Sequence, residues 1–207
     1  MSRKIVIYGD IMLDEFNFGV IRRLSPEGPH PLINLISKKK YLGGVGHVAA
    51  LLKNYSIECE LHTATGQDLY HQEVQDLLID FGVKSIFYHQ DKTTVKQRYI
   101  VEGQTVLRVD EDGYFKDSMS VKLVRDSTCI ISDYGKGFIN RDLISKLASN
   151  ENKIFADVKH KDPKTYDGCY LIKPNLREFN NFTLGSGSES ERALQLLTEL
   201  NIKYLWI

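Results

Sequence analysis

The feature that most constrains this chain is an alternation between short apolar runs and stretches whose apolar residues follow helical spacing. An apolar run at 4–8 predicts a buried strand, and the spacing over 45–52 predicts a core-facing helix. The same two patterns recur along the chain: strands are predicted at 59–65, 85–88, 128–132, 154–156 and 170–172, and helices at 74–81, 142–148 and 189–200. Strands that alternate with helices form βαβ units. We therefore predict an α/β fold with a mainly parallel sheet flanked by helices.

Two stretches interrupt this alternation. Residues 15–42 contain three prolines and strand-like runs at 16–18 and 32–36. Residues 93–110 alternate between apolar and polar side chains around Glu102-Gly103, which predicts a β-hairpin. We expect both stretches to leave the main sheet and to form a small β lid on one domain that spans 1–207. Lys38-Lys39-Lys40 is expected to lie in a solvated loop.

The composition excludes several classes of protein. Lys plus Arg and Asp plus Glu both number 27, so the formal net charge is zero. Proteins that coat nucleic acid or bind membrane surfaces through basic residues need a large cationic excess, so we expect neither partner. No apolar run approaches the roughly 18 residues of a transmembrane helix, and no apolar signal-peptide segment follows the N-terminus. A cytoplasmic location is therefore expected.

The cysteines and histidines show no disulfide or metal-site pattern. Three cysteines, Cys59, Cys129 and Cys169, are odd in number and widely spaced. This pattern supports neither a disulfide framework nor a Cys-x-x-Cys metal site. The six histidines show no spacing typical of metal ligands, and no Ser-His-Asp or Cys-His arrangement can be inferred.

Polar residues follow four of the predicted strands. They lie at 10–14, 133–137, 157–159 and 173–178, and they include acids, lysines and an amide. In open parallel sheets, ligands bind outside the carboxyl ends of the strands. Polar residues after a single strand more often only form a turn. Their repetition after four strands predicts a site for hydroxyls, phosphates and a divalent cation.

A glycine-rich segment, Gly43-Gly44, precedes the first predicted helix. Glycines there let a ligand approach the backbone, and the start of a helix offers N–H groups to an anion. The chain contains no G-x-G-x-x-G or G-x-x-x-x-G-K-[ST] motif, so Rossmann-type nicotinamide enzymes and P-loop NTPases are both unsupported. On local grounds, His47 fits a packing residue better than a ligand.

Two further pairs have competing interpretations. Asn175 and Glu178 have the spacing of a capping box at a helix start, which competes evenly with a ligand-binding role. Lys96 and Arg98 share one face of the predicted hairpin. They could reach a sugar phosphate there, or they could simply form a solvated strand face.

In their order along the chain, these pieces resemble the ribokinase-like (pfkB-type) carbohydrate kinases. Within that family, they are most similar to kinases of D-glycero-D-manno-heptose 7-phosphate. The resemblance covers almost the whole chain and is carried by Gly9-Asp10-Ile11-Met12-Leu13-Asp14, Leu24-Ser25-Pro26-Glu27-Gly28-Pro29, Gly43-Gly44, Thr93-Thr94-Val95-Lys96-x-Arg98, Leu107-Arg108-Val109-Asp110, Ser132-Asp133-Tyr134-Gly135-Lys136-Gly137, Asp157-Val158-Lys159 and Pro174-Asn175-Leu176-x-Glu178.

The resemblance implies roles on the sugar side of the site. Asp14 would accept hydrogen bonds from substrate hydroxyls, and Gly43-Gly44 would form the backbone shelf under the sugar. Lys96 and Arg98 would face the sugar phosphate from the lid. His47 stands where the family usually has Asn, and it would hydrogen-bond a hydroxyl in its place. Lid strands in this family often pair between subunits, which implies a homodimer.

The resemblance also implies a polar floor between sugar and nucleotide, formed by Asp133, Lys136 and Lys159. Asp133 and Lys136 would bind the substrate, and Lys159 would bind the nucleotide phosphates. Asn175 and Glu178 match the family's Asn-x-x-Glu element, which organises Mg²⁺ and its water shell near the ATP phosphates. Glu178 would thus contact the metal through water.

The implied function is ATP-dependent phosphorylation of the anomeric hydroxyl of a heptose 7-phosphate, in the synthesis of ADP-heptose for the lipopolysaccharide core. The family's catalytic base is an aspartate in a Gly-Ala-Gly-Asp motif, expected beyond Ile207. We therefore expect these residues to be a fragment or truncated form, inactive alone. The alternative is a non-catalytic remnant that binds sugar phosphates. A nucleotidyltransferase is the least supported interpretation, because no H-x-G-H-type motif occurs.

Overall fold

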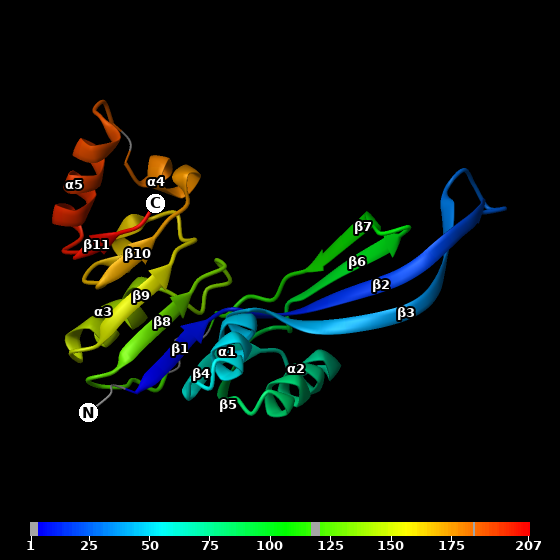
Figure 1. Cartoon of the computed structure of the whole chain (residues 1–207), viewed down its shortest axis with the longest axis horizontal. Helices are drawn as coiled ribbons and strands as arrows, with labels where there is room; N and C mark the ends of the chain where they lie inside the picture. Colours follow the sequence, from blue (N-terminus) through cyan, green and yellow to red (C-terminus); the bar gives the residue numbers. More distant parts are fainter. Residues whose placement is uncertain (1–3, 117–120, 184) are drawn as a thin grey trace.

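The computed structural model describes residues 4–116, 121–183 and 185–207, which form two sheets (Figure 1). The larger sheet has the strand order β11-β10-β9-β8-β1-β4-β5, and its neighbouring strands are all parallel. Its strands are β1 (Ile5–Gly9), β4 (Cys59–Thr65), β5 (Lys84–His89), β8 (Thr128–Ser132), β9 (Lys153–Asp157), β10 (Leu171–Lys173) and β11 (Tyr204–Leu205). The predicted α/β class with a mainly parallel sheet is confirmed.

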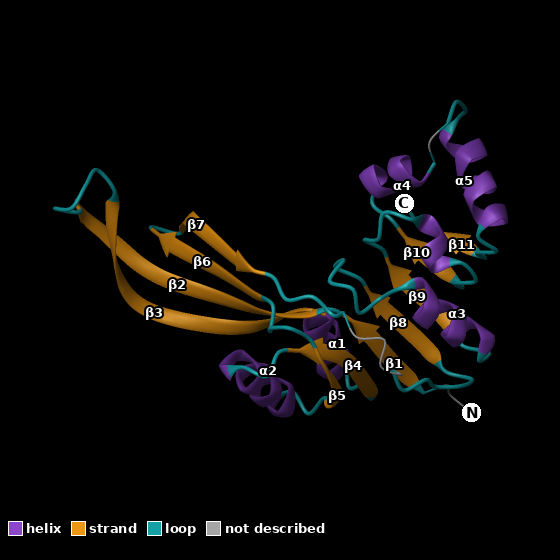
Figure 2. Ribbon diagram, turned by 180° about the vertical axis from the view of Figure 1, so that it is seen from behind, coloured by secondary structure: helices purple, strands orange, loops and turns teal. Residues whose placement is uncertain are grey.

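Helices cover both faces of this sheet (Figure 2). Side chains alternate between the faces of a strand, so in β1 Ile7 packs with α1 and α2, whereas Val6 and Tyr8 pack with α3, α4 and α5. The helices are α1 (Val45–Asn54), α2 (Leu69–Asp80), α3 (Arg141–Ser149), α4 (Leu176–Phe182) and α5 (Glu189–Glu199), with a 3₁₀ turn, η1, at Pro163–Tyr166. Among the described residues, no helix is long and apolar enough to cross a membrane.

Local signals set where several helices begin and end. Gly82, with φ +66°, follows the end of α2, as its position after the periodic run predicted. Ser188 and Glu191 form the predicted capping box at the start of α5. Asn140 caps α3 by accepting a hydrogen bond from the backbone N–H of Leu143.

The smaller sheet is built from the two stretches that interrupt the βαβ pattern. Its strand order is β3-β2-β6-β7, and it extends away from the carboxyl end of β1 (Figure 1). Its strands are β2 (Ile11–Leu24), β3 (Pro31–Gly44), β6 (Val95–Val101) and β7 (Gln104–Glu111). Glu102 and Gly103, with φ of 49° and 78°, make the predicted turn between β6 and β7. We refer to this sheet as the lid.

The expectation of a solvated loop at Lys38-Lys39-Lys40 is wrong, and the expected runs at 16–18 and 32–36 are too short. All three lysines lie in β3, because β2 and β3 each continue for 14 residues. The buried Glu15 on β2 explains this, since its carboxylate lies 3.0 Å from Lys38 Nζ and 3.6 Å from Lys40 Nζ. Lys40 also lies 2.5 Å from Glu73 on α2, which fastens the lid to the main domain.

Candidate active site

The carboxyl ends of four neighbouring strands meet at one edge of the main sheet. The register pairs Gly9 with Ser132, Ser132 with Asp157, and Asp157 with Lys173. The polar residues that follow these strands are therefore neighbours in space, as the parallel topology predicted. The lid leaves the same edge, since β2 begins two residues after β1 ends.

A cavity of about 440 Å³ lies between the base of the lid and the start of α1. We call it the shelf cavity. It brings together four residues that the sequence assigned to the sugar: Asp14, Gly43, Gly44 and His47. Its other lining residues are Phe16, Tyr41, Leu42, Val48 and Tyr134.

The two glycines are needed for the shape of the shelf cavity. A Cβ on Gly43 would lie 2.3 Å from Asp14 Oδ2, so any side chain there would displace the Asp14 carboxylate. Gly44 has φ +58°, a conformation that other residues rarely adopt. Gly44 is also the N-cap of α1 and has no side chain to cap it. The Val45 N–H donates to the Asp10 carbonyl, and the next N–H groups of the first turn have no side-chain cap.

Asp14, which lines the shelf cavity, is paired with Arg98, which does not line it. Arg98 Nη1 donates to Asp14 Oδ1 at 2.6 Å, and the guanidinium lies 5.1 Å from the centre of the Phe16 ring. Both charged side chains are partly exposed, so an arriving ligand can reach them. A carboxylate beside a guanidinium can accept from a hydroxyl while the cation binds an anion. The sequence placed these two residues 84 positions apart and gave no sign of the pairing.

Lys96 and Lys136 lie in an ionic network beside this pair. Lys136 Nζ is 2.7 Å from Asp112, and Lys96 Nζ is 3.1 Å from Asp110 and 3.5 Å from Asp112. The hydrogen bond from Arg108, together with that from Lys96, lowers the pKa of Asp110 to about 2. Neither lysine lines the shelf cavity, so any contact they make with a ligand has to compete with these aspartates.

A second cavity, of about 200 Å³, lies over the ends of β8, β9 and β10. We call it the strand-end cavity. It brings together Lys159, Asn175 and Glu178, which were assigned to the nucleotide, with Asp133, which was assigned to the substrate. Two ion pairs lie along it: Lys159 to Glu178 at 3.1 Å and Lys173 to Asp157 at 3.0 Å. Its other lining residues are Tyr134 and Val158, so Tyr134 lines both cavities.

The capping-box interpretation of Asn175 and Glu178 is confirmed, and their ligand-binding role stays a prediction. The capping box is present: Asn175 Oδ1 accepts from the Glu178 N–H, and Glu178 Oε2 accepts from the Asn175 N–H, each at 2.9 Å. The other carboxylate oxygen of Glu178 accepts from Lys159. The same residues line the strand-end cavity, so the cap fixes a carboxylate at its wall.

The strand-end cavity fits a magnesium ion only in part. In the described residues, no group of three or more His, Cys, Asp or Glu side chains is placed to hold a metal. Mg²⁺ commonly binds through one or two carboxylates together with substrate phosphates and water. Glu178 and Asp157 can supply these one or two carboxylates. This agrees with a contact between Glu178 and Mg²⁺ through water.

Asp133 is mainly engaged with the protein itself. It is buried, its Oδ2 accepts from Tyr166 Oη at 2.5 Å, and its Oδ1 accepts from the Gly135 N–H at 2.7 Å. Tyr166 therefore keeps its proton, since burial and the Asp133 carboxylate raise its pKa well above the usual range. The geometry gives Asp133 the task of holding the loop after β8.

Three residues of this region were not selected from the sequence. Asp112 binds both lysines, Tyr134 lines both cavities, and Asp10 is buried behind them. Asp10 and Tyr134 do lie in the motifs that end β1 and β8, so a signal existed. Asp112 lies just after the predicted hairpin, and no pattern singled it out.

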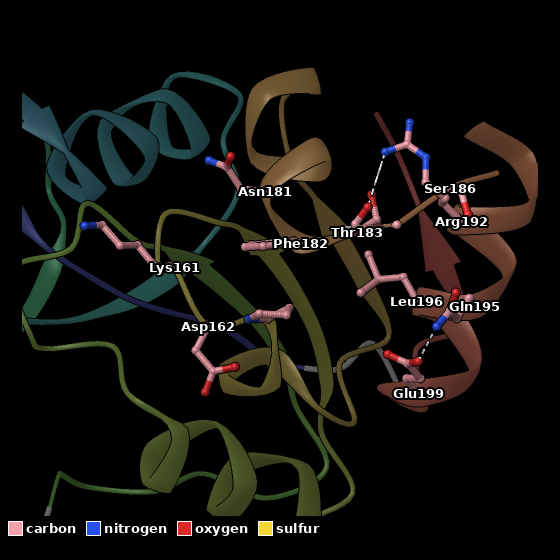
Figure 3. A pocket seen from close by; sticks show the side chains of 12 residues that line it. Lys161, Asp162, Asn181, Phe182, Thr183, Ser186, Arg192, Gln195, Leu196 and Glu199 are labelled. Atoms are coloured by element: carbon pink, nitrogen blue, oxygen red, sulfur yellow. Dashed lines mark hydrogen bonds between the residues drawn. The ribbon is translucent and has the colours of Figure 1, made fainter. Parts of the chain in front are cut away.

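A larger cavity, of about 500 Å³, lies apart from this site, between α4, α5 and the loop before η1 (Figure 3). Four of its polar side chains form two pairs: Arg192 donates to Thr183 Oγ1 at 3.0 Å and Gln195 to Glu199 at 2.7 Å. None of the residues assigned from the sequence lines it. We therefore place the candidate site at the two smaller cavities.

Comparison with solved structures identifies the fold. A ribokinase from Arabidopsis thaliana, complexed with ribose and ATP, aligns with a TM-score of 0.69 at 15% identity, over 99% of this chain and 71% of that one. Phosphofructokinase-2 from Escherichia coli in complex with fructose-6-phosphate aligns with a TM-score of 0.72 at 15% identity, over 99% and 73%. The chain has the ribokinase-like fold.

Sequence relatives of this ribokinase-like chain carry the name bifunctional protein HldE. The protein from Pseudomonas putida (strain KT2440) is 33% identical over 218 residues, covering 98% of this chain and 46% of the relative. The protein from Campylobacter fetus is 28% identical over 213 residues, covering 94% and 46%. The chain thus spans about half the length of the curated relatives it matches. No family model matches it.

Proposed function

We propose that this chain is part of a cytoplasmic, ATP-dependent carbohydrate kinase that phosphorylates the anomeric hydroxyl of a heptose 7-phosphate for ADP-heptose synthesis. The observation that carries the proposal is the pair of adjacent cavities that share Tyr134. One offers a glycine shelf and a carboxylate suited to hydroxyls, and the other offers lysines and acids suited to phosphates and a cation. The resemblance to heptose 7-phosphate kinases and the HldE relatives supply the substrate class.

The roles of the side chains follow from their surroundings. Asp14 would orient the sugar by accepting from its hydroxyls, while the adjacent Arg98 would bind its phosphate. Lys159 and Lys173 would turn from Glu178 and Asp157 towards the ATP phosphates. Mg²⁺ held near Glu178 would neutralise charge on the phosphates. These 207 residues contain no Gly-Ala-Gly-Asp motif, so we expect no phosphoryl transfer by these residues alone.

The experiment that tests this proposal is calorimetric titration of the chain with heptose 7-phosphate, with and without ATP and Mg²⁺. We expect binding of the sugar phosphate. The Asp14→Asn variant should weaken it by about ten- to a hundredfold, because hydrogen bonds to a charged acceptor contribute about 1.5–3 kcal/mol. Asp142→Asn is the control, since Asp142 lies on the exposed face of α3 and pairs only with Lys146 in the described structure. Equal affinity in Asp14→Asn and Asp142→Asn would contradict the assigned role.

A sugar-phosphate-binding protein without catalysis is the second candidate, since the shelf cavity by itself offers a carboxylate and a glycine backbone to a sugar. Titration with ATP and Mg²⁺ separates the two. Binding of both ligands, and phosphorylation once a segment with the base is joined to the chain, supports the kinase. Binding of heptose 7-phosphate with no response to ATP supports the binding protein.

We also propose that the chain forms a homodimer through the lid. Several large apolar side chains of the lid are exposed, including Leu24, Leu35, Ile36 and Leu107. An exposed apolar surface of this kind is typical of an interface. The wild-type chain should sediment at twice its mass of 23.7 kDa, and Ile36→Lys should shift it to the monomer. Leu194→Lys, at an exposed leucine on α5, should leave the dimer intact. A wild-type monomer would refute the proposal.

A further inference from the structure

Tyr134 forms the wall between the two cavities of the candidate site. It follows β8 directly and lines both the shelf cavity and the strand-end cavity. Burial raises the pKa of its hydroxyl, and the charges of Asp157 on one side and Asp14 on the other add to that rise. The hydroxyl therefore stays protonated, and in the described structure no other side chain or backbone group bonds to it. A ligand that reaches from one cavity to the other has to pass this ring.

The buried carboxylate of Asp10 holds the Tyr134 backbone in place. Asp10 Oδ2 accepts from the Tyr134 N–H at 2.7 Å and from the Lys136 N–H at 3.2 Å. Between these two residues, the Gly135 N–H donates to Asp133 instead. The loop after β8 is thus fixed by two buried acids, Asp10 and Asp133. Of these, Asp10 binds the backbone of Tyr134, whose ring separates the two cavities.

The backbone of Asp10 holds the opposite side of the shelf cavity. Its N–H donates to the Ser132 carbonyl at 3.2 Å, and its carbonyl accepts from the Val45 N–H at 3.0 Å. Val45 follows Gly44, whose Cα is so close that an added Cβ would lie 2.3 Å from the Asp10 carbonyl oxygen. One residue therefore ties β1, the loop after β8 and the start of α1 together.

Asp10 is not among the residues that line either cavity. Its side chain is 4% exposed, and its Oδ1 has no hydrogen-bond partner among the described residues. A buried polar oxygen without a partner is costly, and such costs are typical of residues kept for a site rather than for stability. Asp10 can therefore affect a bound ligand only through the residues that it holds, such as Tyr134.

We propose that Asp10 is a positioning residue that fixes Tyr134 between the two cavities, so that the Tyr134 ring and hydroxyl direct a bound sugar phosphate towards the strand-end cavity. The inference rests on the proposed function for the identity of the sugar phosphate. It adds to that function a residue pair whose coupling can be measured. Neither Asp10 nor Tyr134 needs to take part in proton or phosphoryl transfer.

The test is a double-mutant cycle on the affinity for heptose 7-phosphate, with Asp10→Ala, Tyr134→Ala and the double variant. If Asp10 acts through Tyr134, each single change weakens binding by about tenfold, and the double variant is no weaker than Tyr134→Ala. Tripolyphosphate, as a probe for the strand-end cavity, should bind all variants with similar affinity. If the losses of affinity of the two single variants multiply in the double variant, the proposal is overturned, because Asp10 then acts independently of Tyr134.

A second measurement needs no ligand. Amide hydrogen exchange of the free protein should show protected N–H groups at Tyr134 and Lys136, and Asp10→Ala should remove that protection while Tyr134→Phe retains it. If Asp10→Ala fails to fold, Asp10→Asn takes its place in both measurements, with smaller effects because an amide oxygen is a weaker acceptor than a carboxylate. Unchanged exchange at both amides in a folded Asp10 variant would overturn the proposal.

Failure of the inference and failure of the proposed function give different results. If the wild-type chain binds fructose 6-phosphate but not heptose 7-phosphate, only the proposed substrate is wrong, and the cycle is run with fructose 6-phosphate. If it binds heptose 7-phosphate but the losses of affinity of Asp10→Ala and Tyr134→Ala multiply in the double variant, only the inference about Asp10 is wrong. Binding of neither sugar phosphate refutes both.

Discussion

Replacing Gly43 with alanine is expected to abolish binding of the sugar phosphate while the chain remains folded. The added Cβ would lie 2.3 Å from Asp14 Oδ2 and 2.6 Å from Met12 Cγ, both side-chain atoms. The Asp14 carboxylate therefore has to move, and its 2.6 Å contact with Arg98 is lost. Loss of two or more charged hydrogen bonds to a ligand corresponds to a fall in affinity of about 100-fold or more. The backbone of Gly43 is not in the left-handed region, so no backbone strain adds to the effect.

Calorimetric titration and thermal unfolding together check this prediction. Gly185→Ala is the matched control, because an added Cβ there meets no atom within 4 Å. The two variants should unfold at similar temperatures, and only Gly43→Ala should lose binding. Gly44 is a poorer choice, since a Cβ there would meet the Asp10 backbone and Gly44 has φ +58°. If Gly43→Ala binds like the wild type, the shelf cavity is not the sugar site.

The sequence was sufficient for the centre of the main sheet because β1 and β4 are almost fully buried on both faces. Consecutive apolar residues, as at 4–8 and 128–132, indicate a strand that is buried on both faces. The lid was underestimated because its strands are held by charges and polar residues as well. Glu15 and Asn17 are buried inside β2, and Lys38 and Lys40 pair with Glu15 from β3. A polar strand with such partners looks like a loop until its neighbours are known.

The site was predictable where topology alone decides position. Parallel strands bring their carboxyl ends together, so Lys159, Asn175 and Glu178 were expected to be neighbours, and they line one cavity. The pairings at the lid were not predictable from the sequence. Arg98 reaches Asp14 because β6 pairs with β2 inside the lid, and Lys136 reaches Asp112 only once the lid is placed beside the main sheet.

The role of Asp10 was hidden for a different reason. Its side-chain partners are the backbone N–H groups of Tyr134 and Lys136, and these depend on conformation rather than on residue type. A motif can therefore mark such a position without revealing what the residue does there.

Replacing Glu60 with glutamine is expected to cause a large loss of stability for so conservative a change. Glu60 is buried in β4, with Lys84 at 2.8 Å, Lys4 at 3.0 Å and His62 Nε2 at 3.1 Å from its carboxylate. The hydrogen bond from Lys84, followed by those from Lys4 and His62, holds the pKa of Glu60 well below its usual value of 4.5 against the opposing effect of burial. Removing a buried charge with several partners lowers the free energy of unfolding by about 2–4 kcal/mol at pH 7.

The dependence of this loss on pH separates it from a simple packing defect. Because the folded pKa of Glu60 lies below the unfolded one, its contribution is present above about pH 4.5 and disappears as the pH falls towards the folded value. Urea unfolding at pH 7, 5 and 4 should therefore show the gap between wild type and Glu60→Gln narrowing at the acid end. Glu58→Gln, at an exposed glutamate paired with Lys53, should cost less than about 1 kcal/mol throughout. A gap that stays constant across this range would show that Glu60 stabilises the sheet through packing rather than through its charge.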